Sequence, residues 1–405
     1  MPANRLDLDD ALQAILEDTR PIIATERLAV TDALGRIAAS SVLAPMDLPP
    51  FPASAMDGYA VRCGDLKGDP PYRVAITGTS SAGHPLAAAI DQGCVRIFTG
   101  AVIPQGLDAV VIQEDCNRDG DAVIIRERVR DGDNVRPVGH DVRAGAQILA
   151  KGQRITPFDL GWLAACGVDR VDVYQRARIG IFSTGDELLD PGAAPGPGQI
   201  FDANRMTLRA LLANLPVTVR DYGIAADRPE AIRRLLQRAD WECDLVITSG
   251  GVSVGESDWV KQVVEEIGHL DLWRLNLKPG KPVAYGRLGR SAFFGLPGNP
   301  VSTIVTALLL VKPVIVRLCG GRSADPLVVT ALLEGSLKHQ PGREEFQRGS
   351  LEDRDGTLTV RVTGDQSSNR LASFTAANCL IRVGRDLGDL AEGSQVDTLP
   401  FGGML

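Results

Sequence analysis

The sequence predicts a multidomain protein in which a central parallel-sheet α/β domain is combined with mostly β domains. The chain has 405 residues, which is too long for one ordinary domain. Strand-like and helix-like stretches alternate between residues 179 and 320, which indicates a parallel sheet covered by helices on both faces. The segments on either side are rich in Val, Ile and Thr with repeated turn signals, which favours β structure.

The alternating segment divides into strands and helices joined by short loops. Short apolar runs predict strands, and amphipathic runs that begin at a capping residue predict helices. Asp202 or Asn204 is expected to cap one helix, Ser257 another, and Asn299 a third that has Pro300 in its first turn. The expected strands are 178–182, 217–223, 244–248, 281–288 and 291–296, and the expected helices are 202–215, 228–239, 257–268 and 299–318.

Composition outside this segment predicts three further domains. One is mostly β and contains two Asp-Gly turns around an alternating strand. Two short stretches flank it and are expected to form one small α+β linker domain, interrupted by the β insertion. The end of the chain predicts a C-terminal β-barrel-like domain. The expected boundaries are 22–44 with 144–174 for the linker domain, 45–143 for the inserted β domain, 175–326 with the N-terminal helix 7–20 for the α/β domain, and 327–405 for the C-terminal domain.

Charge and composition argue against several classes of function. The formal net charge is −8, whereas nucleic-acid binding needs a clustered basic excess, so no nucleic-acid partner is expected. The seven cysteines form no C-x-x-C pair, which favours a reduced cytoplasmic compartment. The four histidines are isolated, so no zinc site is expected. The longest apolar run, 301–316, contains Lys312 and Pro313 and is expected to be too short and too interrupted to span a membrane.

Loops that follow the expected strands carry the candidate binding residues. Ligands of open parallel sheets bind at the C-terminal ends of the strands, so these loops are expected to gather at one edge. They contain the stretches "STGDEL", "TSGGVSVGESD" and "LPGNP". The residues expected at this edge are Glu187, Asp227, Ser249, Gly250, Gly251, Ser253, Gly255, Asp258, Pro297, Asn299 and Pro300.

The glycine turn in "TSGGVSVGESD" is expected to bind an anion. Successive backbone amides followed by a helix N-terminus make an anion-binding concavity. Gly251 is expected to let an amide approach the ligand at a position where any Cβ would intrude. Each loop alone also has an ordinary explanation as a tight turn or a capped helix start. The expected gathering of several such loops at one edge is what favours a site.

Carboxylates beside this anion site predict a metal ion. They would repel a bound phosphate unless a cation lay between them, and oxygen ligands suit Mg²⁺. Glu187, Asp227 and Asp258 are therefore expected to bind Mg²⁺. Lys278 and Lys281 in "LKPGKP" are expected to hold a second anionic group.

Seven stretches, taken together, resemble one family closely: the molybdopterin molybdenumtransferases, or MoeA and gephyrin E-domain family. The resemblance covers nearly the whole chain in the family's order. The stretches are "PPFPASAMDGYAV", "RIFTGAVIPQGLDAVV", "RPVGHDVRAG", "STGDEL", "TSGGVSVGESD", "LKPGKP" and "FFGLPGNPVST".

The resemblance implies an enzyme that inserts molybdate into adenylylated molybdopterin, releases AMP and requires Mg²⁺. It also implies a homodimer in which the inserted β domain of one subunit faces the α/β cleft of the other. Asp57, Thr99 and Asp141 would then join the same site. The resemblance also makes transient contact with other molybdenum-cofactor proteins an expectation. The residues it implies to be catalytic are Glu187, Asp57, Asp141, Lys278 and Lys281, with Thr99 and the loop residues named above in binding.

Two alternatives stay open at this point. A molybdopterin adenylyltransferase would share the α/β domain, but it would not need the inserted and C-terminal β domains. A non-catalytic molybdopterin-binding scaffold would go with a fused second enzyme domain and a long linker, and neither is recognised in this sequence.

Overall fold

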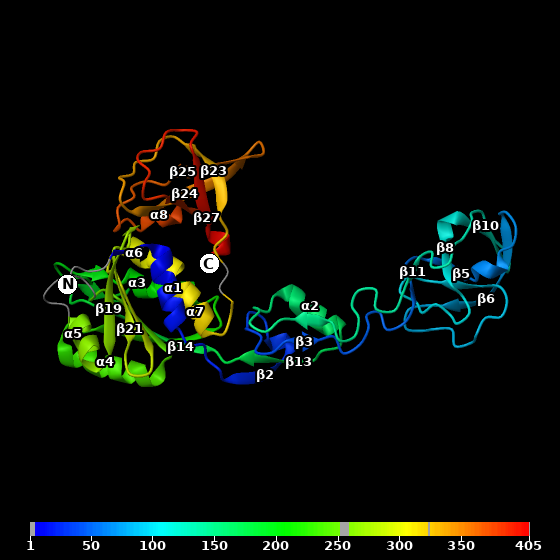
Figure 1. The fold of residues 1–405 in the computed structure, drawn as a ribbon, viewed down its shortest axis with the longest axis horizontal. Helices are drawn as coiled ribbons and strands as arrows, with labels where there is room; N and C mark the ends of the chain where they lie inside the picture. Colours follow the sequence, from blue (N-terminus) through cyan, green and yellow to red (C-terminus); the bar gives the residue numbers. More distant parts are fainter. Residues whose placement is uncertain (1–4, 252–258, 323–324, 405) are drawn as a thin grey trace.

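A computed structural model describes residues 5–251, 259–322 and 325–404. The molecule is elongated, and its parts are spread along the long axis (Figure 1). The C-terminal domain lies over the α/β domain at one end, the linker domain lies in the middle, and the inserted β domain forms the opposite end. The predicted fold class, an α/β domain combined with β domains, is confirmed.

The α/β domain is built on one sheet. Its described strands are β1 (Arg5–Leu6), β14 (Ala177–Thr184), β17 (Val217–Ala225), β18 (Leu245–Ser249), β19 (His269–Leu275), β21 (Pro282–Arg287) and β22 (Ala292–Leu296), in the order β1-β19-β21-β22-β18-β14-β17. The neighbours β22, β18, β14 and β17 are parallel, as the alternating pattern predicted. β21 is antiparallel to β22 and β19, because a short turn joins β21 to β22 as a hairpin, whereas parallel neighbours need a crossover.

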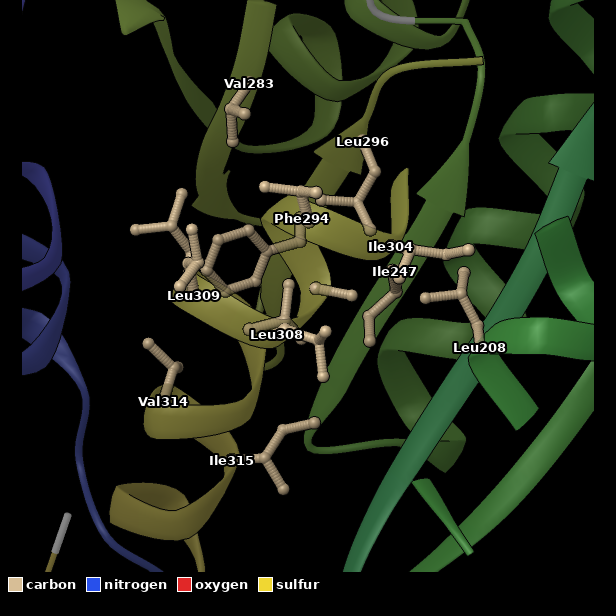
Figure 2. Close-up of a cluster of buried hydrophobic side chains, with 14 of the residues drawn as sticks. Leu208, Ile247, Val283, Phe294, Leu296, Ile304, Leu308, Leu309, Val314 and Ile315 are labelled. Atoms are coloured by element: carbon tan, nitrogen blue, oxygen red, sulfur yellow. The ribbon is translucent and has the colours of Figure 1, made fainter. Parts of the chain in front are cut away.

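Helices cover both faces of this sheet. α1 (Leu8–Asp18) and α3 (Ala203–Leu212) pack on one face, and α4 (Pro229–Glu242) and α5 (Trp259–Ile267) pack on the other. Each face therefore has its own core, the first under α1 and α3 and the second under α4 and α5. Because successive strand residues point to opposite faces, Ile179 of β14 lies in the first core and Phe182 in the second. Figure 2 shows the first core, where Leu208, Ile247 and Phe294 come from α3, β18 and β22.

The expected helix 299–318 is interrupted in its middle. It comprises α6 (Pro300–Thr306), a π-helical turn (Ala307–Val311) and α7 (Lys312–Leu318). The turn precedes Pro313, which has no N–H for the helix ladder, so the backbone widens there.

This interrupted span is also apolar enough to raise the question of a membrane. Among the described residues it is long and apolar enough to cross one, so the expectation that the run is too short is wrong as to length. In the structure 78 % of the span is buried. Its apolar composition is therefore explained by its place in the core of the α/β domain (Figure 2).

The linker domain joins two stretches that are distant in sequence. β2 (Thr25–Ala29) pairs with β13 (Arg170–Tyr174), β3 (Val42–Leu43) pairs with β12 (Gln147–Leu149), and α2 (Pro157–Ala165) begins at a capping box on Thr156. The amide of Ala44 donates to the carbonyl of Ala146 at 2.8 Å, and that of Leu48 donates to Val142 at 2.8 Å. The inserted domain is thus entered and left at neighbouring points.

The inserted domain contains a sheet in the order β8-β5-β7-β6-β10-β9, with β4 and β11 paired beside it. Both Asp-Gly turns predicted from the sequence form turns, with Gly120 at φ +60° and Gly132 at φ +81°. The strands are β4 (Ala53–Ser54), β5 (Gly58–Val61), β6 (Tyr72–Ser80), β7 (Cys94–Ile97), β8 (Ala109–Ile112), β9 (Cys116–Asp119), β10 (Ala122–Ile125) and β11 (Val135–Arg136).

The C-terminal domain is a small closed barrel. Its described strands are β23 (Val329–Glu334), β24 (Glu344–Arg354), β25 (Thr357–Val362), β26 (Cys379–Val383) and β27 (Gln395–Pro400), and α8 (Ala372–Thr375) lies between β25 and β26. Pairing of β24 with β26 closes the ring, and β20 (Leu277–Lys278) of the preceding domain adds to β24. The β24–β25 hairpin turns at Asp355 and Gly356, both at positive φ, which is typical of an Asp-Gly hairpin turn.

Candidate functional site

The candidate site lies where the parallel strands β14, β17, β18 and β22 end, at one edge of the α/β sheet. Hydrogen bonds join the loops that leave these strands. The amide of Gly250 donates to the carbonyl of Leu296 at 3.0 Å. The side-chain amide of Asn204 donates to Ser249 Oγ at 2.6 Å and to the carbonyl of Gly298 at 2.7 Å. The glycine turn and the loop after β22 therefore form one surface.

Carboxylates gather at this edge after β14 and β17. The amide of Asp227 donates to Asp186 Oδ1 at 3.5 Å, and Thr184 Oγ1 donates to Asp227 Oδ1 at 3.5 Å. Burial raises the pKa of Asp227, the charges of Asp186 and Glu187 raise it further, and the Thr184 hydrogen bond opposes them. Negative charges held this close repel one another, so the edge favours binding of a cation.

Glu187 lies on the exposed side of this group, and its carboxylate folds back over Gly185. A Cβ placed on Gly185 would lie 2.5 Å from Glu187 Oε2, and Gly185 has a φ of +145°. A larger residue at Gly185 would displace the carboxylate. The glycine of "STGDEL" thus gives Glu187 its position.

The described residues contain no group of three His, Cys, Asp or Glu side chains that could bind a metal ion. The third predicted carboxylate ligand, Asp258, lies outside the described residues, as do Ser253, Gly255 and the expected cap Ser257. The oxygen donors of Glu187 and Asp227 suit Mg²⁺ in kind. The magnesium site stays a prediction.

The structure gives Gly251 a different reason for being glycine from the one expected. A Cβ at Gly251 would lie 2.5 Å from Val260 Cγ2 and 2.8 Å from Thr184 Cγ2, and its φ is +70°. Packing against β14 and α5 therefore already requires glycine here. Replacement by valine would therefore crowd Val260 and Thr184 whether or not a ligand is bound. The expected approach of the Gly251 amide to a ligand stays a prediction.

The loop after β22 is held by the C-terminal domain. Asn299 occupies the N-cap position of α6, but its side chain makes no capping hydrogen bond and instead donates to Ser368 Oγ at 3.0 Å. The amide of Val301 donates to the carbonyl of Ser368 at 3.1 Å. Thr303 Oγ1 donates to the carbonyl of buried Pro297 at 2.5 Å. The segment between β25 and α8 thus fixes the start of α6, where Pro300 stands.

The "LKPGKP" loop lies at the same edge. β19 runs in the direction of β22, since both are antiparallel to β21, so the loop leaves β19 at the end where β18 and β22 stop. Lys278 is half-buried, and its Nζ lies 2.9 Å from Glu345 Oε1 of the barrel. Lys281 is exposed. Both predicted lysines are therefore at this edge, and the first is held by an acid of the C-terminal domain.

Asp57, Thr99 and Asp141 lie far from this edge within one chain, because they belong to the inserted domain and its connection to the linker (Figure 1). Asp57 Oδ1 accepts hydrogen bonds from Thr99 N at 2.8 Å and from Thr99 Oγ1 at 2.7 Å. These bonds lower the pKa of Asp57, with a smaller contribution from Arg96. Asp141 is exposed, and its amide donates to Leu48.

Several residues of the edge were not predicted. Asp202 is the N-cap of α3, accepting from the amide of Arg205 at 3.1 Å, and this leaves Asn204 free to join the two loops. The sequence signal for Asn204 was present, because it was one of the two cap candidates. Glu345 and Ser368 have no such signal, since they belong to ordinary β and turn patterns of another domain.

Three family models match consecutive parts of the chain. Residues 6–167 match the MoeA N-terminal region (domain I and II), residues 180–317 match a probable molybdopterin binding domain, and residues 330–401 match the MoeA C-terminal region (domain IV). The fold and the loops at the sheet edge thus define a multidomain protein with an α/β domain of the molybdopterin-binding class.

Known proteins are similar over nearly the whole of this chain. The chain is 39 % identical to a molybdopterin molybdenumtransferase of Haemophilus influenzae, over 99 % of this chain and 100 % of that protein. It is 33 % identical to gephyrin of Dictyostelium discoideum, over 98 % of this chain and 62 % of that protein. The crystal structure of a molybdopterin biosynthesis MoeA protein from Pyrococcus horikoshii OT3 matches with a TM-score of 0.85 at 28 % identity, over 98 % of this chain and 100 % of that chain.

The chain belongs to the molybdopterin molybdenumtransferase (MoeA) family. The predicted resemblance is therefore confirmed, and so is the prediction of a transferase of molybdenum cofactor biosynthesis.

Proposed function

We propose that this enzyme inserts molybdate into adenylylated molybdopterin, with release of AMP, in a reaction that depends on Mg²⁺. One observation carries the proposal. Asp186, Glu187 and Asp227 gather beside a glycine turn at the edge where α/β sheets bind ligands, and burial, together with repulsion by the other two charges, raises the pKa of Asp227. A cation between these acids and a phosphate relieves that repulsion, which suits a substrate with a phosphoanhydride.

Each group at the edge then has a role. The amide of Gly251 binds the anionic phosphates, because that of Gly250 already donates to the carbonyl of Leu296. Lys278 and Lys281 offset further negative charge of the substrate and of molybdate. Glu187 and Asp227 are the carboxylates that would hold Mg²⁺. When bound, Mg²⁺ would supply charge neutralisation and polarisation of the phosphoanhydride.

The proposal includes a homodimer with shared sites. Asp57 and Thr99 belong to the inserted domain, which forms the end of the molecule opposite to the α/β domain, and Asp141 belongs to its connection to the linker domain (Figure 1). Placing the inserted domain of one subunit over the α/β edge of its partner joins the two groups, and two-fold symmetry makes two such sites. A cytoplasmic setting and transient contact with proteins that use the product are proposed with it.

The test is molybdate-dependent release of AMP from adenylylated molybdopterin by the purified protein, with and without Mg²⁺. Release that requires both molybdate and the metal supports the proposal. Formation of adenylylated molybdopterin from molybdopterin and ATP would instead identify an adenylyltransferase. Tight binding of adenylylated molybdopterin without any turnover would identify a scaffold.

A further inference from the structure

A buried acid and a buried histidine lie directly behind Lys278. Glu345 accepts from Lys278 Nζ at 2.9 Å through Oε1, and its other oxygen, Oε2, lies 2.7 Å from His339 Nδ1. The side chains of Glu345 and His339 are 3 % and 1 % exposed, whereas that of Lys278 is 44 % exposed. The chain of contacts therefore starts inside the barrel and ends at the open edge of the α/β domain.

The backbone holds this arrangement in register. β20 pairs in parallel with β24, and Lys278 is the register partner of Glu345. On the other side, the amide of His339 donates to Asp389 Oδ1 at 2.9 Å, which anchors the segment that carries the ring. Both partners of the carboxylate are thus fixed by main-chain contacts.

Stability alone does not account for a buried acid at this place. An ionised carboxylate can only accept hydrogen bonds, so His339 Nδ1 must donate to Glu345. The other ring nitrogen, Nε2, is buried and has no hydrogen-bond partner in the described part of the chain. Well-packed apolar residues of similar volume are often at least as stable as a buried ionic group. The cluster is therefore better explained by what it does to half-buried Lys278.

We propose that Glu345, held by His339, is a positioning residue that fixes the Lys278 ammonium at the substrate-binding edge. A free lysine side chain has several rotatable bonds, and orienting it toward the reacting group costs conformational entropy. One N–H of the ammonium donates a hydrogen bond to Glu345, so the lysine is oriented in advance. Its remaining N–H groups face the edge. The C-terminal barrel thereby contributes to the reaction through a residue of the α/β domain. This inference rests on the proposed function.

A double-mutant cycle tests the coupling. The variants are Glu345→Gln, Lys278→Gln and the two combined, and the measurements are kcat for AMP release and the Kd of adenylylated molybdopterin. Glu345→Gln is expected to lower kcat about fivefold while Kd changes less than about twofold, because the lysine keeps its charge but loses its orientation. The double variant is expected to be no slower than Lys278→Gln. Fully additive losses would overturn the proposal, since a merely structural role adds to the loss of the lysine.

A second readout does not depend on activity. Acetylation of Lys278 by an N-hydroxysuccinimide ester, followed by peptide mass spectrometry, reports whether its ammonium is held. Exposed Lys281 is the internal reference. Glu345→Gln should raise the Lys278 to Lys281 labelling ratio at least about threefold, because it removes a buried ion-pair partner. An unchanged ratio would overturn the proposal.

Matched variants separate positioning from folding. Arg354→Gln removes an exposed ion pair elsewhere on the same barrel, Nη1 to Glu334 Oε1 2.8 Å, and should change neither readout. If Glu345→Gln does not fold, His339→Phe removes the donor to Glu345 and should raise Lys278 labelling, whereas His339→Gln keeps a donor and should label like the wild type. Wild-type labelling of His339→Phe would overturn the proposal. If the wild-type protein releases no AMP, the proposed function fails, and the labelling ratio alone decides whether Glu345 holds Lys278.

Discussion

Two aspartates at opposite ends of the molecule lie in opposite electrostatic surroundings. Asp57, in the inserted domain, accepts two hydrogen bonds from Thr99, and these lower its pKa. Asp227, at the α/β edge, is partly buried beside Asp186 and Glu187, and both effects raise its pKa. The carboxylate of Asp57 is stabilised as an anion by its own domain, whereas the surroundings of Asp227 disfavour its charged form.

This difference shows which end of the molecule needs a ligand to be complete. A carboxylate that accepts hydrogen bonds from its neighbours is stable without anything bound. A group of carboxylates that repel one another gains stability from a cation or a proton, and such groups are concentrated at functional sites. We therefore expect the α/β edge to bind the metal, and the inserted domain to present a pre-formed anion to it.

The strongest test of this comparison is Glu187→Gln, which removes one charge from the repelling group. AMP release at saturating Mg²⁺ should fall by about tenfold or more, corresponding to roughly 1.4 kcal/mol of barrier. Binding of adenylylated molybdopterin should persist, because the amides and lysines that hold the anions are unchanged. Glu230→Gln, on the exposed first turn of α4, is the control and should leave both measurements unchanged. Normal AMP release by Glu187→Gln would make Glu187 a surface acid.

A second test asks whether the two ends act in one site. Asp57→Asn and Glu187→Gln subunits, each of low activity alone, should recover about a quarter of wild-type activity when mixed and allowed to exchange. Half of the dimers are then heterodimers, and one of the two sites in each has both native residues. The measurement is AMP release after subunit exchange, with heterodimers verified by differently tagged chains. Verified heterodimers without recovered activity would contradict a shared site.

A third test addresses the pKa of Asp57. Thr99→Val removes the hydroxyl that donates to the carboxylate, so the pKa of Asp57 should rise toward its ordinary value. A lowered pKa keeps the group charged to lower pH, and its rise means that the charge is lost sooner as pH falls. The acidic limb of the kcat/KM profile should therefore move to higher pH. Thr99→Ser keeps the hydroxyl and should keep the acidic limb of the wild type. Identical acidic limbs in the wild type and both variants would show that this hydrogen bond does not set the pKa of Asp57.

The smallest expected effect is on stability. The pKa of Asp227 is raised in the folded protein, so the group contributes stability at low pH and loses it as pH rises through the folded pKa. Asp227→Asn should therefore raise the melting temperature at neutral pH by about 1 °C, while AMP release falls. The gain should disappear below the ordinary pKa of aspartate, where the group is protonated in both states. A lower melting temperature at neutral pH would indicate that the carboxylate is structural.

Much of the α/β edge was predictable because its loops are local. Each of the strands β14, β17, β18 and β22 is an apolar run followed by a polar turn, and parallel strands bring such turns to one edge. Glu187 and Asp227 could therefore be placed together from sequence. β19 was not expected. The sequence also did not show that β21 and β22 form an antiparallel hairpin, because the antiparallel half of the sheet does not alternate with helices.

The contributions of other domains were not predictable from local patterns. Glu345 meets Lys278 only because β20 adds to the barrel, and a strand of two residues leaves no periodic signal. Ser368 reaches Asn299 from a turn of the same barrel. The reason for glycine at Gly251 was missed for a similar cause, because the close neighbours Val260 and Thr184 come from separate elements.

The N-terminal segment has a consequence for the order in which the protein folds. α1 packs against α7, and Leu6 of β1 is the register partner of Leu275 in β19. The first helix to be synthesised therefore cannot dock until nearly all of the α/β domain has been made. The inserted domain, whose strands pair among themselves, can fold long before that. During synthesis, the apolar face of α1 stays uncovered the longest, and its docking is among the last steps that close the α/β core.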